Sequence, residues 1–209
     1  CAPRGRPILG HMLQGLDVEQ NPVLHYGQDK PMPVVYEDDD LVVVNKPAAL
    51  LSVPGVEIED SALTRIKNLY PNATGAILLQ RLDMSTSGLL MFTLNPKANK
   101  RMQRQFIKRQ VQKTYIADVE GVVANNHGII DLPLAPDYYD LPLQMVCDKT
   151  GNASETHWSV ITRSKSTTRL ALKPITGRTH QLRVHCAHPE GLGMPMVGDE
   201  LYGVIGERL

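Results

Sequence analysis

Short apolar runs separated by polar turns recur along the chain from about residue 33. The stretch "PVVYEDDDLVVVNKP" predicts a strand, an acidic turn and a second strand. In the same way, "GAILLQRL" predicts a strand, "DMSTSG" a polar turn and "LLMFTL" another strand. "KTYIADVEG" alternates, which predicts a strand that places Tyr115, Ala117 and Val119 on one side. Further strands are expected at 129–133, 155–162 and 168–175.

Three segments have helical signals instead. Asp60 is a suitable N-cap for a helix over 61–69, in which Leu63, Ile66 and Leu69 form one apolar stripe. Asn95 followed by Pro96 predicts the start of a helix that runs to about Arg109. "TGRTHQLRVHCAH" opens with turn residues and becomes helical from Thr179.

The order of these elements is mixed, with more strand than helix. That pattern predicts an α+β fold built on a mixed, largely antiparallel sheet with flanking helices. Residues 1–32 lack a sustained period and are interpreted as an N-terminal extension or linker, while 33–209 form the folded part, as one domain or two small lobes.

The composition is that of an ordinary globular protein, with 42% hydrophobic and 21% charged residues. No apolar run approaches the roughly 20 residues that a membrane helix needs. The chain begins with Cys1 and shows no apolar signal segment. We therefore expect a cytoplasmic protein without a membrane partner, and we expect this sequence to be a fragment of a longer one.

The net charge is zero, but the charges are unevenly distributed. Residues 37–60 are strongly acidic, whereas 163–183 contain six basic residues and no acid. Residues 97–113 are also free of acids and contain Lys97, Lys100, Arg101, Arg104, Lys108, Arg109 and Lys113. Such asymmetry is typical of a polyanion-binding face on a neutral protein, although a set of solvated faces would give the same composition.

Three residues are candidates for chemistry. Asp83 follows an apolar run and Arg81, and a buried carboxylate is unfavourable unless it is paired and hydrogen-bonded. Tyr115 follows the basic segment, where an aromatic ring could stack on an extruded base. Arg183 is a candidate counter-ion for a carboxylate elsewhere in the fold. Each alone is a weak signal, because a strand-end Asp is more often structural and a strand Tyr usually belongs to the core.

Alternative functions are weighed on the same residues. A non-catalytic RNA-binding module would keep the basic segment but would not need Asp83 and Arg183 together. A hydrolase with an Asp nucleophile usually needs a second carboxylate, and none stands out near a motif. A metal site from His180, His185, Cys186 and His188 fits no common zinc spacing, so no metal is expected.

Five ordered segments resemble one family. "RLDMSTSG" is similar to the R-L-D-x-x-T-S-G motif of the RluA family of RNA pseudouridine synthases. Further family segments are matched by "VVVNKPAALLSVPG", "RQFIKRQVQKTYIADVEG", "LKPITGRTHQLRVH" and "VGDELYG". "DLPL" followed by "GNASET" resembles the branch that contains RluA itself, whose family substrates include rRNA and tRNA.

The resemblance implies a pseudouridine synthase fold over 33–209 and roles for the candidate residues. Asp83 would attack the target uridine, either at C1′ or by a glycal route, and Arg183 would pair with Asp83. Tyr115 would pack against the uracil and assist proton removal from C5. Arg81 would fill the space that the flipped nucleotide leaves.

The same resemblance implies an isomerase that needs no cofactor and binds an rRNA or tRNA stem-loop as a monomer. Its RNA-binding residues would be Arg81, the seven basic residues of 97–113, Arg178 and His180. Two departures from the family stand out. Gln80 replaces the usual His before the motif Arg, and relatives continue past Leu209 with another strand, which leaves open a C-terminal truncation.

Overall fold

The computed structural model describes residues 30–75 and 77–203, and these residues divide into two compact units. The first unit comprises the described residues up to Gln110, and the second begins at Val111. The predicted extension, 1–32, lies almost entirely outside the described residues. The elements are mixed strands and helices with antiparallel pairing throughout the named sheets, so the α+β prediction is confirmed.

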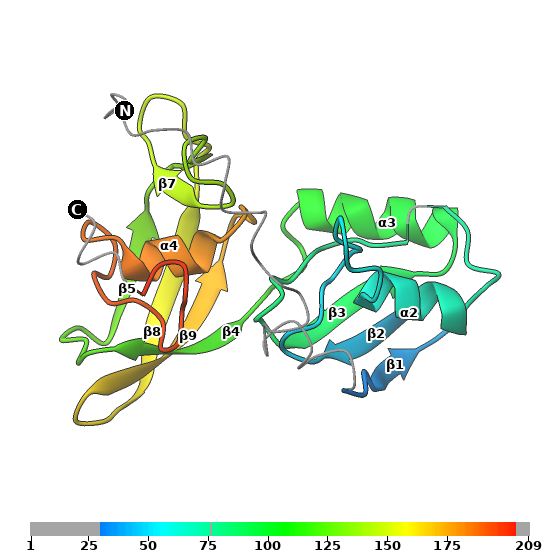
Figure 1. Ribbon diagram of the computed structural model, residues 1–209, viewed down its shortest axis with the longest axis horizontal. Coiled ribbons are helices and arrows are strands. Elements are labelled where there is room, and N and C mark those ends of the chain that lie inside the picture. Colours follow the sequence, from blue (N-terminus) through cyan, green and yellow to red (C-terminus); the bar gives the residue numbers. More distant parts are fainter. Residues whose placement is uncertain (1–29, 76, 204–209) are drawn as a thin grey trace. The chain divides into compact units, whose positions relative to one another are not determined.

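The first unit contains one three-stranded antiparallel sheet in the order β1-β2-β3, and the helices α2 and α3 lie beside it (Figure 1). Its elements are β1 (Val34–Glu37), β2 (Leu41–Lys46), α2 (Ala62–Leu69), β3 (Gly88–Thr93) and α3 (Pro96–Ile107). Period-two alternation puts Val42 and Val44 of β2 and Leu90 and Phe92 of β3 on the buried face. Lys46 occupies the next buried position along β2 and is fully buried.

Local signals set the helix starts of the first unit. Asn95 is the N-cap of α3, its side chain accepts a hydrogen bond from Ala98 N–H, and Pro96 is the first helical residue, as the sequence predicted. The cap predicted for α2 was wrong by one residue. Ser61 accepts from Thr64 N–H, whereas the Asp60 carboxylate forms a bidentate pair with Arg65 at 2.7 and 2.9 Å.

The strand predicted for "GAILLQRL" was wrong. In the described part of that segment, Leu78 forms only an isolated bridge to Phe92, and Ile77 O accepts from Thr93 N–H. The physical reason is that the last apolar residue, Leu82, directs both its backbone polar groups to a side chain, Ser52, rather than to a neighbouring strand. Asp83 therefore follows an extended loop and not a strand.

The second unit contains a four-stranded antiparallel sheet in the order β4-β9-β8-β5, a two-stranded β6-β7 hairpin and helix α4 (Figure 1). The predicted strands are confirmed with small shifts of their ends, whereas the β6-β7 hairpin was not predicted. The elements are β4 (Tyr115–Glu120), β5 (His127–Asp131), β6 (Leu134–Pro136), β7 (Gln144–Val146), β8 (Glu155–Arg163), β9 (Thr167–Pro174) and α4 (Gln181–Ala187).

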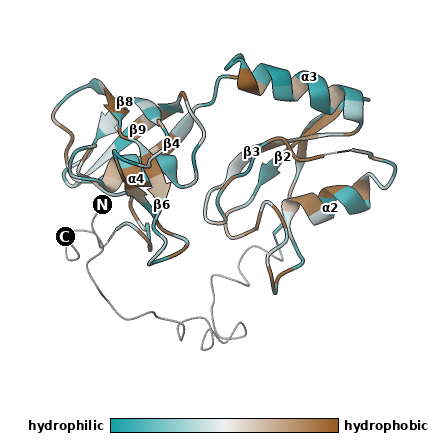
Figure 2. Ribbon diagram, turned by 90° about the horizontal axis from the view of Figure 1, so that it is seen from above, coloured by the Kyte–Doolittle hydropathy of each residue, from teal (hydrophilic) through white to brown (hydrophobic). Residues whose placement is uncertain are grey.

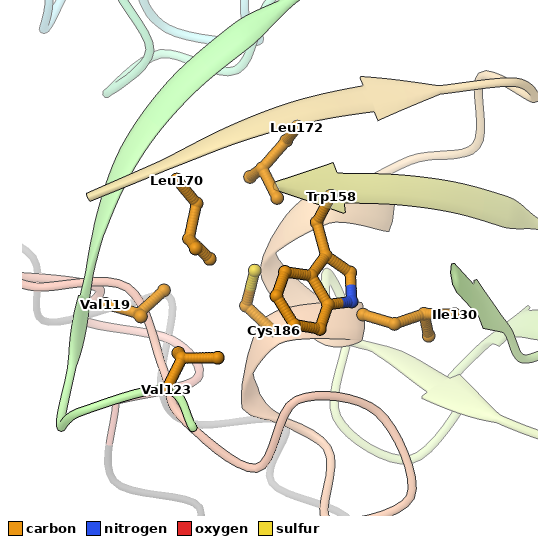
Figure 3. Close-up of a cluster of buried hydrophobic side chains, with 7 residues drawn as sticks. All are labelled: Val119, Val123, Ile130, Trp158, Leu170, Leu172 and Cys186. Carbon is orange, nitrogen blue, oxygen red and sulfur yellow. The ribbon is translucent and has the colours of Figure 1, made fainter. Parts of the chain in front are cut away.

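The core of the second unit lies between its sheet and α4. Side chains from β4, β5, β8 and β9 converge on Cys186 of α4, with the Trp158 indole among them (Figure 3). The buried members are Val119, Val123, Ile130, Trp158, Leu170, Leu172 and Cys186. Burial of apolar side chains stabilises a fold by about 25 cal/mol per Å² of apolar surface. The buried side of α4 therefore holds this helix against the sheet. The residues at its start are thereby fixed relative to the sheet.

Among the helices of the described residues, none has the length and apolar character required to cross a membrane.

Candidate active site

Asp83 is a partly exposed carboxylate that directly follows the buried Leu82. A turn begins at Asp83, because its carbonyl accepts a hydrogen bond from Thr86 N–H at 3.0 Å. The predicted polar turn "DMSTSG" is therefore confirmed. Arg81 lies two residues earlier and is exposed, which leaves its guanidinium in contact with solvent. The chain thus passes from the buried Leu82 to a partly exposed turn at the candidate nucleophile.

Ser52 fixes the residue before Asp83. Its buried hydroxyl donates to Leu82 O at 2.6 Å and accepts from Leu82 N–H at 3.0 Å. One side chain therefore satisfies both backbone groups of a buried residue that has no strand partner there, and an unsatisfied buried group would cost about 1–3 kcal/mol. The "LSVPG" segment thereby holds the backbone at the entry to the Asp83 turn.

Lys46 fixes the residue after Asp83. Its fully buried ammonium donates to Leu50 O at 2.7 Å, to Pro47 O at 2.9 Å and to Met84 O at 3.2 Å. Three carbonyl acceptors require three N–H donors, so this geometry needs the charged form of the side chain. Lys46 and Ser52 together hold the backbone on both sides of Asp83.

The charge of Lys46 also acts on Asp83. Burial lowers the pKa of Lys46 to about 8, and the negative charge of Asp83 raises that pKa and so opposes the shift. At neutral pH, Lys46 is therefore a buried positive charge that interacts electrostatically with Asp83.

The basic residues of α3 form an exposed stripe. Lys97, Arg101 and Arg104 follow one another at helical spacings of four and three, and Lys108 continues the row after the helix ends. Figure 2 shows α3 coloured mainly as hydrophilic. Arg101 is 3.7 Å from Asp40, an exposed pair. Lys100 and Arg109, also predicted to bind RNA, are exposed as well. Such a stripe can contact several phosphates of a polyanion.

Tyr115 and Lys113 lie in the second unit, at and just before the start of β4. Tyr115 is half-buried and packs against the core cluster of this unit, so its ring is held in place from one side. Lys113 differs from the other predicted RNA-binding residues. Its side chain is half-buried, and this burial lowers its pKa. Its Nζ lies close to Gly177, because a Cβ placed on that glycine would be 3.4 Å away from it.

Arg178 and His180 lie in the turn that leads into α4. The buried Gln181 side chain organises this turn, because its Oε1 accepts from Arg178 N–H at 3.0 Å and from the Thr176 hydroxyl at 2.8 Å. The Arg178 side chain is exposed and donates to Ala153 O at 3.2 Å. His180 has a left-handed backbone (φ 53°) and its Nδ1 is 2.7 Å from the Tyr202 hydroxyl.

Arg183 forms a buried ion pair with Asp199. Arg183 Nε donates to one Asp199 carboxylate oxygen at 2.8 Å, and Nη2 donates to the other at 2.6 Å. The side chains are 13% and 3% exposed. Burial raises the pKa of Asp199, but the hydrogen bond from Arg183 and those from Leu201 and Tyr202 N–H outweigh it, so the pKa is lowered. Asp199 is therefore ionised at neutral pH.

The histidines considered as metal ligands have protein partners. Buried His185 lies with Nδ1 2.9 Å from the Thr156 hydroxyl and Nε2 3.0 Å from Leu132 O, which favours a neutral ring protonated at Nε2. Burial lowers the pKa of His185. His188 Nδ1 accepts from Glu190 N–H at 3.2 Å. Within 30–75 and 77–203, no group of three or more His, Cys, Asp or Glu residues could hold a metal ion.

The predicted site residues thus fall in both units. Asp83 lies in the first unit, with Lys46 and Ser52 on either side of its backbone, whereas Tyr115 and Arg183 lie in the second. The pairing of Arg183 with Asp83 stays a prediction.

Three residues at the site, Lys46, Ser52 and Asp199, were not singled out from the sequence. A signal for Lys46 was present, because strand alternation places it on the same face as Val42 and Val44. A lysine in that position must be buried. Ser52 and Asp199 lie in the family-like segments "VVVNKPAALLSVPG" and "VGDELYG", but their roles had no local signal, since their partners lie 30 and 16 residues away.

Comparison with known proteins identifies the family of the chain. A family model described as RNA pseudouridylate synthase matches residues 40–188, which is more than half of the chain. The chain therefore belongs to the RNA pseudouridylate synthase family, a class of isomerases that act on RNA. The match contains Asp83, Tyr115 and Arg183, whereas Asp199 lies beyond its end.

The similarity to particular relatives extends over most of the chain. The chain is 46% identical over 174 residues to the dual-specificity RNA pseudouridine synthase RluA of Yersinia pestis, and the match covers 82% of each protein. It is 43% identical over 178 residues to RluA of Escherichia coli strain K12, covering 84% of this chain and 78% of that protein. The predicted resemblance to the RluA family is therefore confirmed.

Solved structures show the same fold. Human RNA pseudouridylate synthase domain containing 1 superposes with a TM-score of 0.69 at 29% identity, covering 85% of this chain and 72% of that one. Human RNA pseudouridylate synthase domain containing 4 gives a TM-score of 0.65 at 27% identity, covering 81% and 68%. The predicted pseudouridine synthase fold is confirmed.

Proposed function

We propose that this protein converts specific uridines of structured RNA, in rRNA, tRNA or both, to pseudouridine, with Asp83 as the nucleophile. The observation that carries this proposal is the environment of Asp83. Its carboxylate follows the motif "RLD" and is partly exposed, while Ser52 and the charged Lys46 hold the flanking backbone. The RluA relatives carry the name of dual-specificity RNA pseudouridine synthases, which supports both the reaction and the choice of substrates.

The reaction rearranges atoms already present in the substrate. Asp83 attacks the target nucleotide, at C1′ or through a glycal route, and the N-glycosidic bond breaks. The uracil then rotates, a bond forms between C5 and C1′, the proton on C5 leaves to solvent, and N1, which cleavage has freed, takes up a proton. Substrate and product are isomers, so no oxidant, reductant or cofactor is consumed.

The second unit supplies the remaining groups in this proposal. Arg183 is the cation that pairs with Asp83, and an arginine stays charged at any pH at which the protein is folded. Tyr115 packs against the uracil and assists removal of the C5 proton. Its attachment to the core cluster supports this role, because an aromatic ring held from behind is rigid enough to position a base. Arg81 enters the space left by the flipped nucleotide.

The basic stripe of α3 is proposed to bind the RNA backbone, with Lys113, Arg178 and His180 contacting the RNA from the second unit. Phosphate contacts position an RNA without reading its sequence, so the stripe supports affinity and not the choice of uridine. We further propose that the protein acts as a monomer in the cytoplasm, where rRNA and tRNA are found.

Release of tritium from RNA labelled with [5-³H]uridine tests this function, because the C5 hydrogen leaves only when the new bond forms. The RNA comes from a strain that lacks related synthases. Wild-type protein is expected to release tritium. Asp83→Asn, which removes the nucleophilic charge at constant size, should be more than about a thousandfold slower. The control Asp39→Asn alters an exposed carboxylate of the same unit and should match wild type.

The second candidate function, a non-catalytic RNA-binding module, is favoured by the basic stripe alone. Filter binding of the same RNA separates the two. RNA binding by wild-type protein without any tritium release would support the binding module and contradict the proposed enzyme.

A further inference from the structure

Asp199 contacts more than the guanidinium of Arg183. The carboxylate oxygen that receives Arg183 Nη2 also accepts the backbone N–H groups of Leu201 and Tyr202, each at 3.0 Å. The same carboxylate therefore fixes both the arginine and the turn that follows it. At 3% exposure, it has little freedom to move toward water.

The guanidinium is restrained from a second direction by Tyr202. The Arg183 Cζ atom lies 5.1 Å from the centroid of the Tyr202 ring, a cation–π distance. The His180 ring meets Tyr202 edge-on at 5.6 Å between centroids. A bidentate carboxylate sets the plane of a guanidinium, and an aromatic face limits its tilt. Arg183 is thus held in one orientation by its own unit.

A second Arg–Asp pair in the same unit shows what such a pair does without burial. Arg169 donates to Asp118 through Nε and Nη2, both at 2.8 Å, across the β4-β9 ladder. Its side chains are 52% and 39% exposed. The two pairs have the same chemistry and nearly the same geometry, but only the Arg183 pair involves a proposed catalytic side chain.

We propose that Asp199 is a positioning residue for catalysis, which holds the Arg183 guanidinium in the orientation needed to pair with Asp83. This inference rests on the proposed function. Exposed Arg–Asp pairs contribute little to the stability of a fold, and a buried pair is not in itself evidence that the fold is stabilised. Asp199 also lowers the net positive charge next to Arg183. A role in orientation accounts for a carboxylate at this place, whereas a simple need for positive charge does not.

The test is a kinetic comparison of Asp199→Asn with Asp118→Asn, using single-turnover tritium release at varied RNA concentration. Asparagine keeps the size of Asp199 and an oxygen that can accept from Leu201 and Tyr202 N–H, but it loses the charge and the second acceptor for Arg183. The maximal rate of Asp199→Asn is expected to fall about ten- to a hundredfold with the half-saturating RNA concentration within about twofold, since small displacements of a catalytic group have effects of this size. Asp118→Asn should match wild type in both parameters.

A second background separates positioning from a purely structural role. Lysine at position 183 cannot make the bidentate contact, so Arg183→Lys already loses the orientation that Asp199 imposes. Adding Asp199→Asn to Arg183→Lys should then reduce the rate by less than about twofold. Asp199→Glu keeps the charge but moves it by one methylene, and an intermediate rate is expected. This variant also provides the comparison if Asp199→Asn does not fold.

The outcomes distinguish the inference from the function beneath it. If wild-type protein releases no tritium, the proposed function fails. If wild type is active and folded Asp199→Asn or Asp199→Glu reacts at the wild-type rate, only the positioning role is contradicted. An equal loss of rate from Asp199→Asn in the wild-type and Arg183→Lys backgrounds also contradicts it, because Asp199 would then act independently of Arg183.

Discussion

Lys46 in the first unit and Arg183 in the second are both cations largely withdrawn from water, but different groups compensate their charges. Three backbone carbonyls accept from the Lys46 ammonium, and no carboxylate is needed to complete its hydrogen bonds. Arg183 is held by the buried carboxylate of Asp199. The hydrogen-bond acceptors of Lys46 are neutral backbone oxygens, whereas the acceptor of Arg183 is a charged carboxylate.

This difference determines what each cation can do. Lys46 is a buried charge that interacts with the negative charge of Asp83, and its pKa of about 8 places it near the limit at which that charge is lost. Arg183 keeps its charge at every relevant pH, but its orientation depends on Asp199. The first unit therefore places a titratable charge near the proposed nucleophile, and the second provides a permanent charge with a fixed direction.

The largest loss of stability should follow removal of the carboxylate that pairs with Arg183. Asp199→Ala leaves Arg183 buried without its carboxylate, and breaking a buried pair in this way costs about 3–5 kcal/mol. The free energy of unfolding, measured by urea denaturation, should fall by that amount. Asp118→Ala, in the exposed pair, should have a much smaller effect. Equal losses in the two variants would show that burial does not distinguish the pairs.

A smaller loss of stability is expected when Lys46 is removed. Lys46→Met fills the space but leaves the carbonyls of Pro47 and Leu50 without their donor, which should lower the free energy of unfolding by roughly 1–3 kcal/mol. Met84 O keeps its hydrogen bond from Ala49 N–H. Lys67→Met on the exposed side of α2 serves as the control and should be unchanged. Identical urea midpoints for all three proteins would refute the role of the Lys46 contacts.

The pKa of Lys46 makes that loss depend on pH. Its folded pKa of about 8 lies below the ordinary value of 10.5, so the unfolded chain binds more protons between these values. Stability that depends on Lys46 should therefore rise from pH 8 to 10.5, by at most about 1.4 kcal/mol per pH unit. The difference in unfolding free energy between wild type and Lys46→Met should grow over this range. A constant difference from pH 7 to 10 contradicts the lowered pKa.

The smallest effect should come from salt acting on the exposed pair. Charges of Asp118 and Arg169 are screened by added ions, whereas the buried Asp199 and Arg183 are screened much less. Raising the sodium chloride concentration to about 1 M, where the Debye length is about 3 Å, should abolish the small effect of Asp118→Asn on stability. The effect of Asp199→Asn should persist. Equal sensitivity of the two effects to salt would contradict the difference in burial.

Features with local causes could be predicted from the sequence. The Asn95 cap, Pro96 and the helical spacing after them predict α3 and its basic stripe without reference to the rest of the fold. Strand alternation predicts β4 with Tyr115 on its core-facing side. The motif around Asp83 is similarly local, which is why the candidate nucleophile was identified directly.

Features that depend on distant partners could not be predicted in this way. The segment before Asp83 looks like a strand, but Ser52, 30 residues earlier, takes the hydrogen bonds that a neighbouring strand would have formed. Nothing near Arg183 indicates that Asp199 accepts its hydrogen bonds. Ser61 replaced Asp60 as the cap of α2 because Arg65 pairs with the Asp60 carboxylate. In each case a contact made by a side chain decided between locally similar alternatives.

The central claim is that Asp83 isomerises uridine without releasing the base, and analysis of the reaction products tests it most directly. RNA from a strain that lacks related synthases is incubated with wild-type protein or Asp83→Asn, and its nucleosides and any free uracil are separated by chromatography. Wild-type protein is predicted to convert uridine to pseudouridine one for one, with no free uracil and no conversion by Asp83→Asn. Free uracil in place of pseudouridine, or equal conversion by the variant, would contradict the account.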